Sequence, residues 1–476
     1  MTRSRLIALL AAGGVTIAAA VWGGAAWRTH AAVARVVESL PGAEAYPAVM
    51  RELIQDARAH AGTWGGAVHG LAELSMVHHA NGHTEEARQC YAALEVLEPA
   101  EPRWRYRHAL LLSGIGDAAG AQHRFAEAVR LAPGYAPARV RLGEVLLKQG
   151  NVAAAAEAFL GVLGTIGNDP HALAGAARCR MEEGRWDEAL GYLERAMEVS
   201  QGKIGYDLIV TVYEKLQLPA KARAVRAKGK FSAAYRDMDD PWMEELWPYL
   251  RDPFQLSLAA ATVKDRGDLV GALGLLQRAI ELAPRDATLQ FQRGIVEAGR
   301  GDRRSALAAF EACTSLDPTF ADGWAWRSSI HELLGDEPSS VRVLEQGLAA
   351  CPESPGLHLM RAKRRVQAGR LADAVSDYQV AVRLRPNDAD LFVDLAMTLF
   401  RSGQEAEGLA AMQRALEAEP DHPLALTTLT FAAIQSRDEA ATRRWLERIR
   451  DQPRVKPEDV HRLESLAAET FLWRVQ

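Results

Sequence analysis

The sequence contains few of the residues and motifs from which catalytic and metal sites are built. Its four cysteines are scattered and form no CxxC pair, which excludes a zinc knuckle and a thioredoxin-type centre. It has no GxGxxG, GxxxxGK[ST], HExxH or GxSxG motif, so the common nucleotide, zinc-protease and nucleophile sites are missing. We therefore expect no catalytic residues, no cofactor and no metal ion, and the sequence does not predict an enzyme.

Charge and histidine content exclude further classes. A net charge of -5 at pH 7 gives no general attraction to nucleic acid or to anionic lipid. The densest group of candidate metal ligands is His78, His79 and His83. On a helix His78 and His79 point to different faces, and Gly82 ends the helix before His83. We therefore expect no metal site among them.

One long uncharged run lies at the N-terminus. Residues 6–27 contain no charged side chain, and as a helix they would measure about 33 Å, enough to cross a bilayer. Arg3 and Arg5 precede the run, which favours a cytoplasmic N-terminus and an extracytoplasmic location for the rest. We predict a transmembrane signal anchor. The alternative is a cleaved signal, because Ala32–Ala34 (AVA) fits the small-residue rule for cleavage.

Glycine recurs at a fixed interval through most of the chain. The interval is 34 residues in each half: Gly82, Gly116, Gly150 and Gly184, then Gly267, Gly301, Gly335, Gly369 and Gly403. Alanines follow the first four glycines by five residues, and the second half repeats a proline at the same interval (Pro284, Pro318, Pro352, Pro386, Pro420). A period held through nine glycines predicts stacked structural repeats.

Each repeat is predicted to be a pair of antiparallel helices. The glycine can adopt the left-handed conformation that closes a helix, and the alanine five residues later lets the second helix approach closely. A large side chain four residues after the alanine fills the space between the helices, as at Tyr91, Phe125, Phe159, Leu276, Phe310 and Tyr378. The proline ends the second helix.

These features resemble the tetratricopeptide repeat (TPR) family. APARVRLGEVLLKQGNVAAAAEAFLGVL (136–163) and ADLFVDLAMTLFRSGQEAEGLAAMQRALEAEP (389–420) follow its pattern closely, whereas Arg105, Arg327 and Arg361 depart from its first-helix signature. The resemblance implies an all-α, right-handed superhelical solenoid of helix pairs. It also implies that protein or peptide segments bind in a concave groove lined by the first helix of each pair.

The repeat frame divides the chain. We predict a cytoplasmic N-terminus (1–5), a transmembrane anchor (6–27), a helical lead-in (28–67), TPR array 1 (68–229), a wedge between the arrays (230–252), TPR array 2 (253–450) and a capping helix (451–476). The capping helix is expected to dock through Phe471, Leu472 and Trp473. It starts with a proline and acids and has apolar residues at helical spacing.

The wedge contains the one stretch that breaks the repeat. Gly184 and Gly267 are 83 residues apart, fifteen more than two repeats, and MDDPWMEELWPYLRDPF (238–254) lies in this slip. Its aromatic residues Trp242, Trp247 and Tyr249 are either a ligand patch or a plug for the apolar ends of two arrays. We favour the plug, which would set the angle between the solenoids, as at junctions in some exported bacterial TPR proteins that the stretch resembles.

The groove positions implied by the family differ between the arrays. Array 1 offers basic and aromatic residues: Arg103, Tyr106, Arg107, Arg141 and Arg178. Arg107 and Arg141 occupy the same position in adjacent repeats and would suit a carboxylate or acidic peptide, although solvated arginines are the alternative. Array 2 offers apolar residues for a hydrophobic anchor: Phe291, Trp326, Met360, Met397 and Phe400. If the frame is shifted by one residue, some of these pack between helices instead.

Together with the predicted anchor, the resemblance implies a non-catalytic scaffold or adaptor on the extracytoplasmic side of a bacterial membrane, serving envelope protein or complex assembly. The groove contains none of the asparagines that the family's carboxylate clamp needs, so we expect no binding of chaperone C-termini. Two alternatives stay open: an accessory subunit of a membrane redox or transport enzyme, and a purely structural spacer.

Overall fold

The computed structural model describes residues 24–200, 204–219, 221–222, 225, 238–450, 452 and 454–472, and within them it contains only helices and loops. The contacts divide the chain into two units, residues 1–266 and 267–476. No helix in the described ranges is both long and apolar enough to cross a membrane. Residues 6–23 of the predicted anchor lie outside those ranges, so the anchor stays a prediction.

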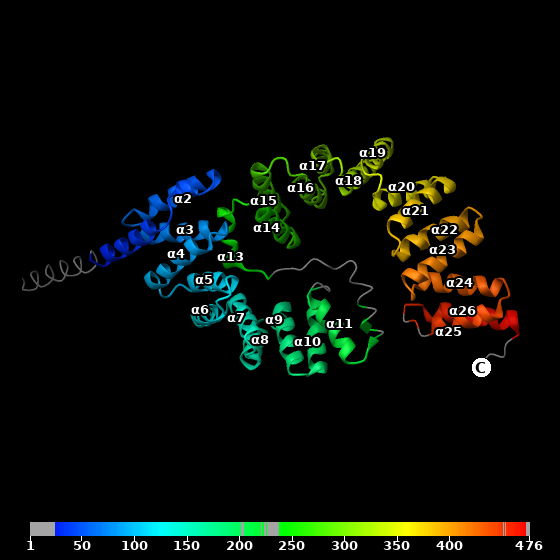
Figure 1. Cartoon of the computed structure of the whole chain (residues 1–476), viewed down its shortest axis with the longest axis horizontal. Coiled ribbons are helices and arrows are strands. Elements are labelled where there is room, and N and C mark those ends of the chain that lie inside the picture. Colours follow the sequence, from blue (N-terminus) through cyan, green and yellow to red (C-terminus); the bar gives the residue numbers. More distant parts are fainter. Residues whose placement is uncertain are drawn as a thin grey trace, which may run out of the picture. The chain divides into compact units, whose positions relative to one another are not determined.

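The described part of unit 1 starts with a helix over residues 24–39 and continues as helix pairs (Figure 1). Its elements are η1 (Ala43–Ala45), α2 (Ala48–Ala61), α3 (Ala67–Ala80), α4 (Thr84–Leu97), α5 (Pro102–Gly114), α6 (Ala118–Leu131), α7 (Ala136–Lys148), α8 (Val152–Ile166), α9 (Pro170–Glu182), α10 (Trp186–Val199), α11 (Tyr206–Lys215), α13 (Pro241–Glu244), η2 (Trp247–Tyr249) and α14 (Pro253–Asp265). The boundary between the units follows α14, although the sequence frame started array 2 with that helix.

Unit 2 continues the pattern of stacked pairs (Figure 1). Its helices are α15 (Leu269–Leu282), α16 (Ala287–Gly299), α17 (Arg303–Leu316), α18 (Ala321–Leu333), α19 (Glu337–Ala350), α20 (Pro355–Gln367), α21 (Leu371–Leu384), α22 (Ala389–Arg401), α23 (Glu405–Ala418), α24 (Pro423–Gln435), α25 (Glu439–Arg450) and α26 (Pro457–Phe471). The predicted all-α solenoid of helix pairs is confirmed.

The periodic glycines close the first helices as predicted. All nine have a positive φ, between +74° and +90°. After eight of these nine glycines the next residue donates its N–H back to the helix, as from Asp117 to the Leu112 carbonyl at 2.9 Å and from Asp302 to the Glu297 carbonyl at 3.0 Å. Aspartates then cap the next helix: the Asp302 carboxylate accepts from the Ser305 N–H at 3.0 Å.

The periodic alanines and aromatic residues form the core of each pair. Ala121 and Ala306 are fully buried, and so is Phe310, four residues after Ala306. A Cβ atom added to Gly294 on the facing helix would lie 2.5 Å from the Phe310 ring. The facing helices therefore pack in contact at this level, and only small residues fit there.

The three arginines that depart from the family signature have carboxylate partners on second helices. Arg105 pairs with Glu127 at 2.9 Å, Arg327 with Glu311 at 3.2 Å, and Arg361 with Asp377 at 2.7 Å. Asp377 is buried and also accepts from Arg365 at 2.7 Å, so its charge is compensated inside the α20–α21 pair. At these positions ion pairs take the place of apolar packing, within a helix pair for Arg105 and Arg361 and between neighbouring pairs for Arg327.

The predicted capping helix is α26, which packs against α24 and α25. Leu463 and Ala467 are buried there, and Phe471 lies partly buried against the same core. Leu472 is 90% exposed, so the prediction that it docks was wrong: its left-handed backbone ends the helix before that residue can turn inward. Trp473 lies outside the described residues.

One repeat lost its glycine and kept the glycine conformation. Arg437 lies 34 residues after Gly403, has φ +56°, and is exposed. Side chains other than glycine are strained there. We predict that Arg437→Gly raises the free energy of unfolding of unit 2 by about 0.5–1 kcal/mol and that Gly403→Arg lowers it by about 1–2 kcal/mol. Urea unfolding followed by circular dichroism measures both.

Arg437→Ala is the control, because it keeps the strained backbone and removes only an exposed side chain. We expect it to change the free energy of unfolding by less than about 0.5 kcal/mol. An equal gain from Arg437→Ala and Arg437→Gly would show that the side chain, and not the backbone conformation, costs the stability.

Candidate functional site

The wedge stretch folds back onto the first helices of unit 1. We call residues 238–251 the docked segment; it contains the short helices α13 and η2. Its contacts reach α3, α5 and the residue before α7, more than one hundred positions earlier in the chain. The residues of α5 that meet it are Arg103, Tyr106 and Arg107, three of the groove positions that the family resemblance implied.

Two tyrosines hold the first carboxylate of the docked segment. The Tyr135 hydroxyl donates to Asp240 Oδ1 at 2.5 Å, and the Tyr106 hydroxyl donates to Asp240 Oδ2. Burial and the neighbouring Asp240 carboxylate raise the pKa of both tyrosines, so both hydroxyls stay protonated donors. Asp240 also caps α13 by accepting from the Met243 N–H at 3.2 Å.

The first aromatic residue of the docked segment lies between the same tyrosines. The Trp242 ring stacks on Tyr135 with 3.5 Å between centroids and 11° between planes, and it meets Tyr106 edge-on at 5.4 Å. The backbone N–H of Trp242 donates to the Tyr135 hydroxyl oxygen at 3.1 Å. Tyr135 therefore recognises both the ring and the backbone, and each such aromatic contact contributes about 0.5–1.5 kcal/mol beyond burial.

Two arginines of α5 hold the next carboxylate. Arg107 is fully buried and donates from Nη2 to Glu245 Oε2 at 2.5 Å and from Nε to the Trp242 carbonyl at 3.1 Å. Arg103 donates from Nη1 to both Glu245 oxygens at 3.1 and 3.2 Å, and it also pairs with Glu101. The sequence suggested an acidic target for Arg107, and in the structure an acidic residue of the same chain occupies that place.

An asparagine that sequence reasoning did not single out holds the end of the docked segment. The Asn81 side chain donates to the Tyr249 carbonyl at 2.9 Å and accepts from the Arg251 N–H at 2.8 Å. One amide thus pairs with two backbone groups, which requires no particular side chain from the segment. The signal in the sequence was slight, because Asn81 is the residue just before the periodic Gly82.

Of the other predicted groove residues of array 1, Arg141 lies near Tyr106, where its charge opposes the rise in the Tyr106 pKa, and Arg178 lies apart from these contacts. Arg141 pairs with Glu144 at 3.0 Å on α7, and Arg178 is exposed on α9. The sequence predicted that the wedge stretch plugs the apolar ends of the arrays. In the structure Met238 of this stretch packs in the core around Val140 and Cys179 of unit 1. The predicted role of the segment in setting the angle between the arrays stays a prediction.

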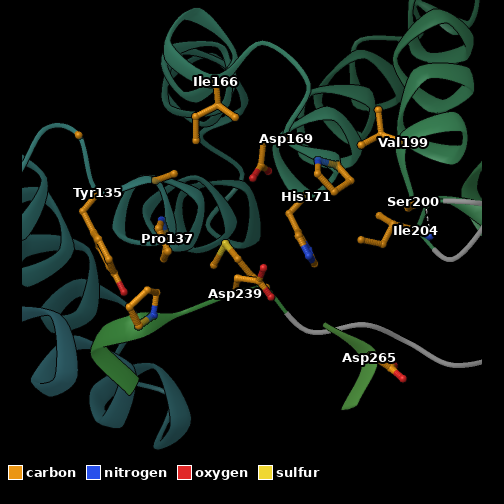
Figure 2. Close-up of a pocket in the computed structure, with 15 residues that line it drawn as sticks. Tyr135, Pro137, Ile166, Asp169, His171, Val199, Ser200, Ile204, Asp239 and Asp265 are labelled. Atoms are coloured by element: carbon orange, nitrogen blue, oxygen red, sulfur yellow. Dashed lines mark hydrogen bonds between the residues drawn. The ribbon is translucent and has the colours of Figure 1, made fainter. Parts of the chain in front are cut away.

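A cleft of about 650 Å³ lies beside the N-terminal end of the docked segment. Figure 2 shows its lining, which includes Tyr135, His171, Ile204, Asp239 and Asp265. Asp239 pairs with Arg266 at 2.9 Å. Within the described residues no group of three histidine, cysteine or acidic side chains is placed to hold a metal ion.

The predicted groove residues of array 2 divide by exposure. Trp326 is 40% exposed and Met397 is 42% exposed. Phe431, one repeat after Met397, is 46% exposed. Phe291 packs against Phe310 and Phe320, with ring centroids 5.7 and 5.0 Å apart.

Two further residues of that set are partly buried. Met360 packs against the cluster around Trp324 and Leu344. Phe400 packs beside Gly408, where an added Cβ atom would lie 2.4 Å from its ring. Phe291, Met360 and Phe400 thus contribute to packing between helices, the alternative that a shifted frame allowed, while Trp326 and Met397 present apolar surface on first helices.

The histidines expected to diverge lie partly together. The His78 and His83 rings are 5.6 Å apart, and Tyr46 lies within 5.2 Å of both, whereas His79 turns to the Tyr91 hydroxyl at 3.1 Å. His78 is fully buried and neither ring nitrogen has a hydrogen-bond partner in the described structure. Burial lowers the pKa of His78 to about 4, and the charges of His83 and Arg58 act in the same direction.

This burial predicts an acid-sensitive unit 1. Between the ordinary pKa of about 6.5 and the folded value of about 4, the unfolded chain binds the His78 proton and the folded chain does not. Stability is therefore full above pH 6.5 and falls toward pH 4, by about 1.4 kcal/mol per pH unit for one such proton. We expect His78→Leu to remove that part of the slope in urea unfolding at stepped pH. An unchanged slope would contradict the assignment.

The comparisons with known proteins agree on one family. Models described as tetratricopeptide repeat match residues 106–171, 172–203, 291–355 and 365–430. Cellulose synthase operon protein C of Xanthomonas axonopodis pv. citri (strain 306) is 25% identical over 312 residues, which cover 63% of this chain and 18% of that protein. Tetratricopeptide repeat protein 21A of Mus musculus is 23% identical over 393 residues, covering 74% and 30%. The chain thus spans less than a third of either relative.

Solved structures with the same repeat are also similar to the chain. Yeast Tom70 covers 85% of this chain and 96% of its own, with 14% identity and a TM-score of 0.37. YrrB, described as a TPR protein with an unusual peptide-binding site, covers 37% and 91%, with 20% identity and a TM-score of 0.29. The family matches, the 34-residue period and the stacked helix pairs of both units show that the chain belongs to the tetratricopeptide repeat family.

Proposed function

We propose that the chain is a non-catalytic scaffold that binds a protein or peptide partner on the first helices of unit 2. The TPR repeats support protein–protein interaction in general. The observation that carries the finer proposal is a set of apolar side chains, Trp326, Met397 and Phe431, exposed on first helices of unit 2. Large apolar side chains that gather on solvent-exposed surface are typical of interaction sites.

The proposal also includes a location. The uncharged run at residues 6–27, preceded by Arg3 and Arg5, supports an anchor in a bacterial inner membrane with both units on the periplasmic side. A partner in envelope protein or complex assembly fits that location. The location depends on the sequence alone, and the interaction surface does not depend on it.

The partner side chains that suit unit 2 are apolar. Met397 and Phe431 lie one repeat apart at the same position, and Lys363 precedes Met397 by the same interval. Lys363 is 3.8 Å from Asp394, whose pKa is raised by burial and by the nearby Asp390 and Asp388. An extended or helical segment with hydrophobic anchors could bind there, because methionine and aromatic side chains adapt to varied apolar groups.

We predict that Met397→Glu/Phe431→Glu removes the partner recovered by copurification from crosslinked membranes and quantified by mass spectrometry. Two buried charges in an apolar contact would cost enough to lower recovery at least tenfold. The variant should keep its helical circular dichroism, since both side chains are nearly half exposed.

Val270→Glu/Val341→Glu is the matched control. These valines are exposed on second helices of unit 2, α15 and α19. We expect this variant to recover the partner as the wild type does. If both double variants and the wild type recover the same proteins, unit 2 acts as a spacer and the proposed surface is wrong.

A further inference from the structure

The docked segment contacts unit 1 in the manner of a bound peptide. Its Asp240, Trp242 and Glu245 are each met by side chains of the concave face, and its backbone is met by Arg107 at one end and Asn81 at the other. The two carboxylates and the ring follow one another within six residues, so one short sequence carries all three of these side chains.

We propose that the concave face of unit 1 is a binding site for acidic–aromatic peptides, and that the docked segment is its displaceable built-in occupant. The partner would present an acid, an aromatic residue two positions later and a second acid three positions after that, as Asp240, Trp242 and Glu245 do. This site is separate from the apolar surface of unit 2, so it goes beyond the proposed function.

The occupant satisfies the site incompletely. Arg107 is fully buried, and its Nη1 has no hydrogen-bond partner in the described structure. Its other two nitrogens share one carboxylate oxygen and one carbonyl. A carboxylate that accepts from both terminal nitrogens would pair the guanidinium fully. A partner peptide placed in that way makes one more hydrogen bond to Arg107 than the docked segment does.

Features of the docked segment also favour its local release from unit 1. Its helices are short, α13 with four residues and η2 with three, so little cooperative structure holds them. Its contacts with α5 include the hydrogen bonds of Asp240 and Glu245, which water can replace, and the Glu245 side chain is 38% exposed. Trp242 and Met243 also pack against the core around Tyr106, and this apolar packing sets the strength that a partner must exceed. Segments of this kind open locally while the surrounding helices stay folded.

The tether sets the strength that a competing peptide needs. An attached segment competes at an effective concentration on the order of millimolar, so a free peptide with the same sequence binds the wild type poorly. Weakening the attached segment removes this competition and exposes the site. The site is thereby closed to weak acidic peptides and open to a partner that binds better than the segment or arrives at high local concentration.

The test is binding of a fluorescent peptide with the sequence MDDPWMEELWPYLR, residues 238–251, to the full-length chain. The opened variant is Trp242→Ala/Glu245→Ala, which removes the stacked ring and the carboxylate from the attached segment. By fluorescence anisotropy we expect the opened variant to bind the peptide at least tenfold more tightly than the wild type. Equal, weak binding to both proteins would overturn the proposal.

Matched changes assign the binding to this face. In the opened background Tyr106→Phe/Arg107→Gln should weaken binding at least tenfold, whereas Arg178→Gln, at an exposed arginine of α9, should leave it unchanged. A peptide with Ala in place of the residues that correspond to Trp242 and Glu245 should not bind. Binding that ignores these changes would place the peptide elsewhere and overturn the site.

If the opened variant does not fold, hydrogen exchange of the wild type decides. Exchange at the amides of Met243, Glu244 and Leu246 that is at least tenfold faster than in α5 and α7 supports a displaceable occupant. Exchange of these amides only together with α5 and α7 would show a permanent part of the core and overturn the proposal. Neither result bears on Met397 and Phe431, so the two proposals fail separately.

Discussion

The structure depends on the left-handed backbone residue, a glycine at nine positions, that ends the first helix of a pair. That one backbone conformation turns the chain so that the second helix packs against the first, and the alanine five residues later allows the close contact. Since each pair repeats the same turn, the first helices line one face throughout a unit. The concave face of unit 1 and the apolar side chains of unit 2 both follow from this repetition.

The same scaffold carries different chemistry in its two units. In unit 1 Arg103, Tyr106 and Arg107 of α5, with Tyr135 just before α7, hold carboxylates and an aromatic ring of the chain itself. In unit 2 the corresponding helices expose apolar side chains such as Met397 and Phe431. A chain of this design can engage two partners of unlike character, because groups that suit one face leave unpaired charge or exposed apolar surface on the other.

The helix pairs could be predicted from the sequence because their determinants are local. Glycine, alanine and proline at a 34-residue interval specify the turn, the contact and the helix end within one repeat. The docking of residues 238–251 could not be predicted in this way. Its contacts join Asn81 to Tyr249 and Arg107 to Glu245 across irregular backbone, and no period relates such positions. Periodicity also could not show that Trp326 is exposed and Phe400 partly buried. Both lie on first helices, and the position of each residue within the helix turn determines its exposure.

The docked segment changes how unit 1 responds as a mechanical object. In an array of repeats each pair touches only its neighbours, so stability is a sum of nearest-neighbour terms and the ends can fray independently. The docked segment contacts four successive places in unit 1: Asn81 at the end of α3, Arg107 on α5, Tyr135 before α7 and the core around Cys179 on α9. The docked segment thus links these helices to one another in addition to the contacts between neighbouring repeats. These contacts couple the helices from α3 to α9, so we expect them to open more cooperatively with the docked segment in place than without it.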